Sequence, residues 1–155
     1  MNAVDPGSVA QQIQQAVRKI DWARYDSAEP TEVEYAFNRL VQARTEADAP
    51  AAYDAVLNVL AHNHSGWVWA CAVPAAPILA RVVADCTGIP RRVAPEILVD
   101  LVSWSTAGSA DSDEVGQALR AAAGTLTPLL NRLATSRQNK AATRLAHDLL
   151  DALNA

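Results

Sequence analysis

Residues 30–41, with the sequence PTEVEYAFNRLV, decide the fold class of this chain. Their apolar side chains recur at intervals of three and four residues, as Val33, Ala36, Phe37, Leu40 and Val41. Thr31 and Glu34 have the spacing of a capping box, and Pro30 stands directly before them. The stretch therefore predicts an amphipathic helix that begins near residue 30.

The same helical spacing continues in both directions from this stretch, and no segment alternates as a half-buried strand does. A helix is predicted by each of six further apolar stripes, at residues 9–20, 53–60, 93–102, 115–122, 126–133 and 142–153. The apolar run from Trp67 to Val83 contains Pro74 and Pro77, each of which removes one backbone donor. We therefore expect a kinked or two-piece helix over residues 67–83 rather than a strand.

These patterns predict about eight helices in a single domain that spans residues 1–155. The connections between the helices are only a few residues long, and short connections place neighbouring helices antiparallel. The expected fold is all-α, a short α-solenoid of HEAT-like antiparallel helix pairs. Because the sequence shows no internal repeat, an irregular helical bundle remains the alternative.

Composition limits the classes of partner. Half of the residues are hydrophobic and 19% are charged, which is typical of a folded domain. The net charge at pH 7 is −4, whereas a nucleic-acid-binding protein needs a basic surface. No run of about 18 apolar residues is free of charge or proline, as a membrane span would require. We therefore expect neither a nucleic acid nor a membrane as partner.

The cysteines and the first residues indicate the compartment. Cys71 and Cys86 are too few for a disulfide framework. We expect buried free thiols, although one bond between the two cysteines is conceivable. Met1–Pro6 has neither the basic nor the apolar region of an export signal. A reduced, cytoplasmic setting is therefore expected.

The middle of the chain has a sequence pattern that also occurs in known proteins. Residues 64–79, HSGWVWACAVPAAPIL, combine a His-x-Gly-x-x-aromatic stretch with an alanine-rich helix in which a proline precedes aliphatic residues. A Pro-Arg-Arg break at 90–92 then leads into a leucine-rich helix at 97–101. This pattern, within roughly residues 33–105, resembles bacterial HEAT/armadillo-like proteins. Trp69 and Pro77 fit the pattern, whereas Pro74 is additional.

The resemblance implies a fold and a class of function. HEAT/armadillo-like proteins are α-solenoids, in agreement with the fold expected from the helix pattern. Small acidic α-solenoids of this kind resemble immunity proteins, which protect bacteria from their own or a neighbour's secreted toxin. Others of this kind are scaffolds. The resemblance thus implies that the chain binds another protein.

The residues that could carry chemistry do not assemble into a recognisable motif, and we expect no catalytic, cofactor or metal site. His62 and His64 lie near Cys71, but they are two residues apart, and a metal site needs three or four convergent ligands. Cys71 lies in an alanine-rich run that would raise the pKa of its thiol and oppose a nucleophilic role. The acids within Asp111–Glu114 lack the spacing of a calcium loop and are typical of a helix start.

Two features are candidates for contact with a partner. Four acids surround the start of the helix at 30–41: Asp26, Glu29, Glu32 and Glu34. They form either a solvated face or a docking surface for a basic partner such as a nuclease toxin. On a helix, Trp67 and Trp69 would point about 200° apart, so both cannot face one core layer. We expect Trp69 and Trp104 in the core and Trp67 exposed as an anchor for a partner.

Three hypotheses for the function follow. The preferred one is a protein-binding module, namely an immunity protein that neutralises a cognate bacterial toxin by occlusion. The second is a HEAT-like scaffold or regulatory protein without a toxin partner. The third is an enzyme that uses the region of His62, His64 and Cys71. The acidic balance and the lack of a catalytic motif favour the first.

Overall fold

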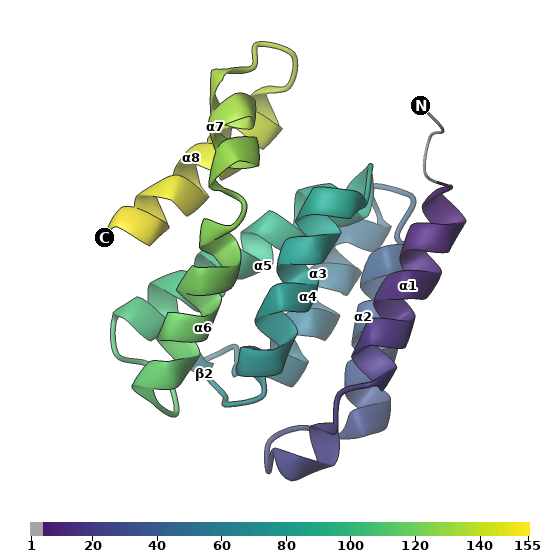
Figure 1. Ribbon diagram of the computed structural model, residues 1–155, viewed down its shortest axis with the longest axis vertical. Coiled ribbons are helices and arrows are strands. Elements are labelled where there is room, and N and C mark those ends of the chain that lie inside the picture. Colours follow the sequence, from purple (N-terminus) through teal and green to yellow (C-terminus); the bar gives the residue numbers. More distant parts are fainter. Residues whose placement is uncertain (1–4) are drawn as a thin grey trace.

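The computed structural model describes residues 5–155, apart from the side chain of Pro6 (Figure 1). Within these residues the chain forms eight α-helices, one short 3-10 helix and one two-stranded antiparallel hairpin. The elements are α1 (Pro6–Arg18), η1 (Trp22–Arg24), α2 (Pro30–Gln42), α3 (Asp48–Leu60), β1 (Ala61–His62), β2 (Trp67–Val68), α4 (Ala72–Asp85), α5 (Ile89–Thr106), α6 (Asp113–Gly124), α7 (Thr127–Thr135) and α8 (Lys140–Asn154). The prediction of an all-α fold with about eight helices is confirmed.

The helices form two layers (Figure 1). α1, α4 and α6 lie in the front layer of this view, where α4 contacts both of the others. α2, α3, α5 and α8 lie behind them, where α5 contacts the other three. Consecutive helices run in opposite directions where they pack against each other, as α4 and α5 do, whereas α7 continues in the direction of α6. α5 also contacts α4 and α6, so it is the central helix of the stack.

α2 shows how the local sequence sets a helix. All five apolar residues that predicted it are buried. Its start differs from the prediction, because Glu29 is the N-cap and its carboxylate accepts the backbone N–H of Glu32 at 2.8 Å. Pro30 occupies the first helical position, where its missing N–H is not needed. Thr31 therefore lies inside the first turn and is not the cap that its spacing with Glu34 predicted.

The prediction of a helix over residues 67–83 is wrong at its start. Trp67 and Val68 form β2, and α4 begins only at Ala72. Pro74 consequently lies in the first turn of α4, where backbone N–H groups have no helical acceptor, so it costs no hydrogen bond. Only Pro77 stands inside this helix. The two-residue strands are too short to show an alternation in the sequence.

One cluster of buried apolar side chains runs from Val9 in α1 to Leu149 in α8. Its largest fully buried members include Trp22, Phe37 and Leu98. Throughout residues 5–155 no charged side chain is buried, so the charges of this part lie at the surface. None of the described helices has the length and apolar character needed to cross a membrane. The prediction about export concerned mainly residues 1–4, which lie outside the described part.

Candidate functional site

Three segments that are distant in the sequence meet at one end of the helix stack, at the bottom of Figure 1. They are residues 21–29 before α2, the hairpin region 61–71, and the α5–α6 loop 107–112. The Ser27 hydroxyl lies 3.8 Å from the Cys71 sulfur, which joins the first segment to the second. A parallel bridge between Val68 and Ala110 joins the second to the third. We call these three segments, together with the first turns of α2 and α6, the loop end.

The hairpin of the loop end is closed by a tight turn. Ala61 pairs with Val68, and His62 pairs with Trp67. The carbonyl of His62 accepts the backbone N–H groups of Ser65 and Gly66 at 3.1 and 2.9 Å. Gly66 has a φ of +65°, a conformation that favours glycine because it has no Cβ. The turn brings two strands together immediately after α3.

A side chain at Gly66 would also meet a neighbour. A Cβ placed there would lie 3.2–3.3 Å from atoms of the Trp104 indole. Trp104 belongs to α5 and is only partly buried, as is Trp69. Both tryptophans were predicted to lie in the core, but they lie at its border. The Trp104 ring packs against the turn at Gly66.

The hairpin fixes the direction and the position of Trp67. Along each strand, successive residues face opposite sides, so Ala61 and Val68 are buried while His62 and Trp67 are exposed. Trp67 is 41% exposed, and its indole N–H donates to the Asp111 carboxylate at 2.8 Å. The other oxygen of that carboxylate accepts the backbone N–H of Ala70 at 2.8 Å. The Asp111 carboxylate therefore fixes both the Trp67 indole and the backbone at Ala70.

The prediction that a helix would direct Trp67 and Trp69 to opposite faces is wrong, because Trp67 lies in strand β2 of the hairpin and not in a helix. In an extended chain, residues two apart face the same side. The Trp69 ring lies edge-on to the His62 ring, with 6.5 Å between their centroids. The His64 ring in turn lies 6.2 Å from the His62 ring. The loop end thus combines an exposed indole with two exposed imidazoles and one half-buried indole.

Three of the four predicted acids belong to the loop end. Asp26, Glu29 and Glu32 are exposed, and the Glu29 carboxylate caps α2. Glu34 is only half exposed, because it lines a small groove between α1 and α2 together with Arg18. The structure therefore brings Asp26, Glu29 and Glu32 to the same end as Trp67, and directs Glu34 toward α1.

The loop end is strongly acidic. Its acids are Asp21, Asp26, Glu29, Glu32, Asp111, Asp113 and Glu114, and Arg24 is its one base. All seven of these acids are exposed, and Asp113 and Glu114 lie in the first turn of α6, as predicted. The summed field of such a surface attracts basic molecules over a distance of about 10 Å at moderate salt.

Sequence reasoning missed two residues of interest. Asp111 was expected only as part of a helix start, because its bonds to Trp67 and Ala70 cross more than 40 residues of sequence. Tyr35 on α2 is 59% exposed, and the Arg39 guanidinium lies 5.9 Å from its ring centroid. Tyr35 was visible in the sequence, since it stands opposite the apolar stripe of α2.

Neither cysteine has the surroundings of a nucleophile. The Cys71 thiol donates to the carbonyl of Val59 at 3.3 Å, and its other hydrogen-bond partner is Ser27. Burial raises the pKa of this thiol. Neither partner is a histidine, so the structure does not bring Cys71 to a general base. Within residues 5–155, no three side chains among His, Cys, Asp and Glu converge as metal ligands would.

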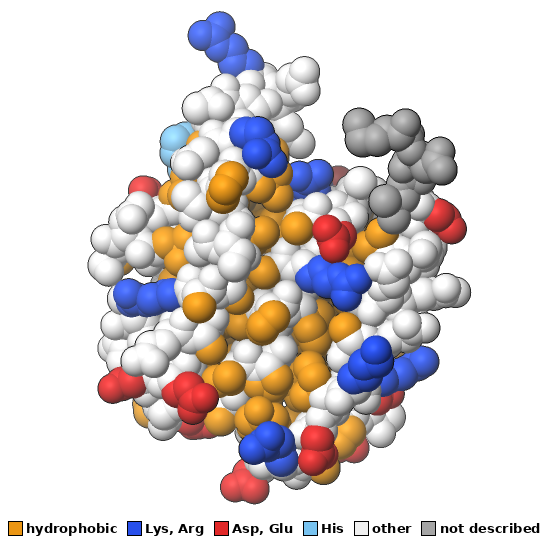
Figure 2. Space-filling model, viewed as in Figure 1, with side chains coloured by type: hydrophobic (Ala, Val, Ile, Leu, Met, Phe, Trp, Pro, Cys, Tyr) orange, Lys and Arg blue, Asp and Glu red, His pale blue; other side chains and the backbone are white. Residues whose placement is uncertain are grey.

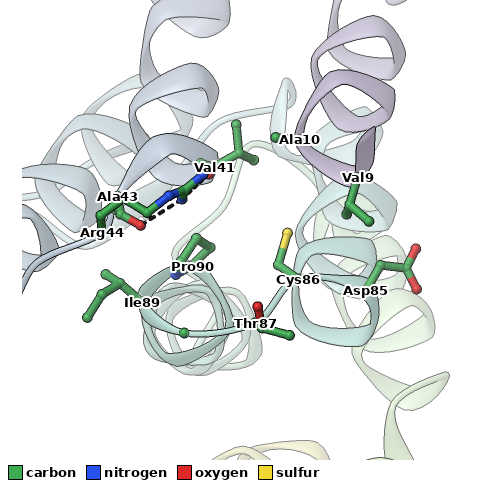
Figure 3. Close-up of a pocket in the computed structure, with 11 residues that line it drawn as sticks. Val9, Ala10, Val41, Ala43, Arg44, Asp85, Cys86, Thr87, Ile89 and Pro90 are labelled. Carbon is green, nitrogen blue, oxygen red and sulfur yellow. Dashed lines mark hydrogen bonds between the residues drawn. The ribbon is translucent and has the colours of Figure 1, made fainter. Parts of the chain in front are cut away.

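Cys86 lines a cavity of about 270 Å³ between α1, the end of α2 and the α4–α5 link (Figure 3). The Arg44 guanidinium on the opposite wall donates to the carbonyls of Val41 and Ala43, each at 3.0 Å. Burial, and then the Asp85 carboxylate, raise the pKa of the Cys86 thiol. The cavity therefore holds a protonated thiol and an arginine engaged with backbone. Both cysteines are free.

Comparison with known proteins adds no family to this description. No protein-family model matches the chain, and no curated protein or solved structure matches it significantly. The resemblance over residues 33–105, and the function that it implies, therefore stay predictions.

Proposed function

We propose that this chain is a protein-binding module, and specifically an immunity protein that neutralises a cognate bacterial toxin by occluding it. The loop end is the surface that binds the toxin. The observation that carries the proposal is the position of Trp67, an exposed indole held by Asp111 among seven exposed acids. The partner is accordingly a basic protein domain, such as a nuclease.

The fixed position of Trp67 supports its role as an anchor. Tryptophan is among the residues that contribute most to binding when they fill a pocket of a partner. An indole already held in place loses little side-chain entropy when it is bound. The bond to Asp111 and the closed turn at Gly66 supply this order before binding.

The acids support the choice of a basic partner. A nuclease needs a basic active-site cleft to hold the phosphates of its substrate. A surface with seven acids and one base offers that cleft a similar pattern of charge, so it can cover the cleft and exclude the substrate. The same field increases the rate of association, and added salt reduces that increase.

The test uses the toxin domain encoded beside this chain in its genome. Toxin activity is titrated with the purified chain, and the association and dissociation rates are measured over a series of salt concentrations. We expect inhibition at equimolar protein and an association rate that falls as salt rises. Trp67→Ala should raise Kd at least tenfold through faster dissociation, and Asp26→Lys with Glu32→Lys should mainly slow association.

A matched charge change elsewhere serves as the control. Asp148 and Asp151 are exposed on α8, outside the loop end, so Asp148→Lys with Asp151→Lys should leave both rates within about twofold. Equal effects of this double variant and of Asp26→Lys with Glu32→Lys would assign the effect to net charge and remove the loop end from the proposal. The absence of any encoded toxin, or of a complex with it, would refute the function.

The scaffold hypothesis is favoured by one observation. Acids gather at the loop end, whereas residues 131–144 at the α7–α8 turn contain four bases and no acid. Two surfaces of opposite charge suit a protein that joins two different partners. A complex in which a protein other than a toxin occupies the loop end would favour this alternative.

A further inference from the structure

A cleft with a volume of about 450 Å³ lies between the first turns of α5 and the α7–α8 hairpin. One wall is formed by the first turns of α5 and includes Arg91, Arg92 and Pro95. The opposite wall comes from α7 and α8 and includes Leu133 and Leu145, both of which are only half buried. The cleft therefore exposes an apolar floor in which these two leucines are only partly covered.

The rim of the cleft is basic. Arg91, Arg92 and Lys140 lie at or beside it, and Arg144 follows one turn after Lys140 on α8. Arg92 is neutralised by Glu46, whose carboxylate accepts two hydrogen bonds from its guanidinium at 2.6 Å each. The side chains of Arg91, Lys140 and Arg144 form no ion pair or hydrogen bond with the described residues. Figure 2 shows Lys and Arg side chains around the upper end of the molecule, where α7 lies.

The backbone adds to this positive field. α5 and α8 both begin at the cleft, and neither has an acid in its first turn. The cap of α5, Gly88, provides no side-chain acceptor, so the first N–H groups of that helix are not capped by a side chain. The N-terminal end of a helix carries a partial positive charge. Two such ends therefore reinforce the charge of the arginines and the lysine.

The corner that forms one wall is well fixed. The Thr143 hydroxyl lies 3.0 Å from the carbonyl of Leu133 and 2.9 Å from that of Ser136, so it joins α8 to the end of α7. The Asn139 side chain accepts the backbone N–H of Ala142 at 3.1 Å and caps α8. The cleft is thus preformed, which lowers the entropic cost of binding in it.

We propose that this cleft binds an acidic, amphipathic segment of a partner protein, whose aliphatic side chains contact Leu133, Leu145 and Pro95 while its carboxylates face Arg91 and Lys140. An apolar floor between unpaired cations complements apolar side chains flanked by acids. This surface is distinct from the loop end, and the inference holds whether or not the loop end binds a toxin.

The charges next to the cleft limit where the segment lies. Farther along α5 and α8, the neighbouring groove is lined by Glu96, Asp100 and Asp148 as well as by Arg144. These carboxylates repel an acidic segment, so its acids must lie at the first turns of α5 and α8. Glu96→Gln removes one such repulsion and is expected to tighten binding slightly.

The test uses three fluorescein-labelled peptides and the full chain, with binding followed by fluorescence anisotropy. The first peptide has leucines at helical spacing separated by glutamates, the second has lysines in place of the glutamates, and the third has serines in place of the leucines. We expect the first to bind at least tenfold more tightly than either of the others. Arg91→Glu with Lys140→Glu should weaken its binding at least tenfold.

Two further variants make the result decisive. Ala142→Trp fills the cleft without changing a charge and should also abolish binding, with its fold checked by circular dichroism. Lys19 and Arg24 are exposed at the other end of the molecule, so Lys19→Glu with Arg24→Glu is the matched control and should leave Kd within about twofold. Equal binding of the serine peptide, or no effect of the cleft variants, would overturn the inference. Self-association that Ala142→Trp abolishes would show instead that a second copy occupies the cleft.

Discussion

The two ends of this molecule are built differently. The loop end is acidic and polar, and its segments are held by specific hydrogen bonds: Asp111 to Trp67 and Ala70, and the closed turn at Gly66. The opposite end, which we call the cleft end, consists of the first turns of α5 and the α7–α8 hairpin; it is basic, and it leaves an apolar floor exposed between these elements. The loop end exposes the Trp67 side chain, which can enter a pocket of a partner. The cleft end forms a cavity that can accept side chains of a partner.

The difference between the two ends shows how helix pairs of similar build come to have different surfaces. At the loop end, the connections are long enough to carry a hairpin and a 3-10 helix, and these expose polar and aromatic groups. At the cleft end, the links are short and the helix starts themselves form the surface. The connections therefore form the surface of the loop end, whereas the helices themselves form most of the surface of the cleft. The following predictions test how firmly each end is held.

Replacement of Trp22 should have the largest effect. Trp22 is 1% exposed, and its indole N–H donates to the carbonyl of Val17 at 2.8 Å, which fixes η1 against the end of α1. Trp22→Ala should lower the free energy of unfolding by about 3–5 kcal/mol, measured by urea denaturation. Trp22→Phe keeps most of the apolar contact and should cost about 1–3 kcal/mol. Equal losses for the two variants would show that packing does not hold the loop end.

Gly66→Ala should have the next largest effect. The substitution introduces a side chain at a positive φ and places its Cβ against the Trp104 ring. We expect a loss of about 1–3 kcal/mol in the same assay. Gly108 also has a positive φ, +84°, but no atom of the described residues lies within 4 Å of where a Cβ would stand, so Gly108→Ala should cost less. If both cost the same, Trp104 does not support the turn.

At the cleft end, Thr143→Val should have a moderate and local effect. The variant keeps the shape of the side chain but removes the hydroxyl that joins α8 to the carbonyls of Leu133 and Ser136. We expect a loss of about 1 kcal/mol. Hydrogen exchange in α7 and α8 should become faster while α2 and α3 keep their rates. Uniform acceleration in all helices would instead show that the α7–α8 hairpin unfolds together with the rest of the stack.

The smallest effects concern two glutamates near the cleft whose pKa values shift in opposite directions. The bond to Arg92 lowers the pKa of Glu46, so its contribution to stability is present above its unfolded pKa and is lost as the pH falls through the folded value. Burial raises the pKa of Glu96, so its contribution is present at low pH and is lost as the pH rises through the folded value.

Paired variants measure the signs of these two effects. At neutral pH, Glu96→Gln should raise the free energy of unfolding by less than about 0.5 kcal/mol, and the gain should vanish in acid. Glu46→Gln should lower stability at neutral pH and have little effect in acid. Urea denaturation at both pH values gives the comparison, and a stabilising Glu46→Gln at neutral pH would contradict the assigned ion pair.

The sequence predicted the fold better than the candidate site. The apolar stripe of α2 was correct at every position, because helical contacts join residues three and four apart. The start of α4 was wrong, because the strands of the hairpin are stabilised by pairing with residues 109–111, far along the chain. The acids and Trp67 were found as separate features, and only the structure places Asp26, Glu29 and Glu32 at the same end as the indole.

The sequence by itself determined the helices apart from the start of α4, the buried face of α2, and the acidic and basic segments, since each depends on residues close together along the chain. The tertiary structure decided which of these segments share an end, that Asp111 holds Trp67, and that a cleft opens between α5 and α8. The physical reason is distance along the chain: Trp67 and Asp111 are separated by 44 residues, and no local pattern encodes a contact that forms only when helices from distant segments pack together.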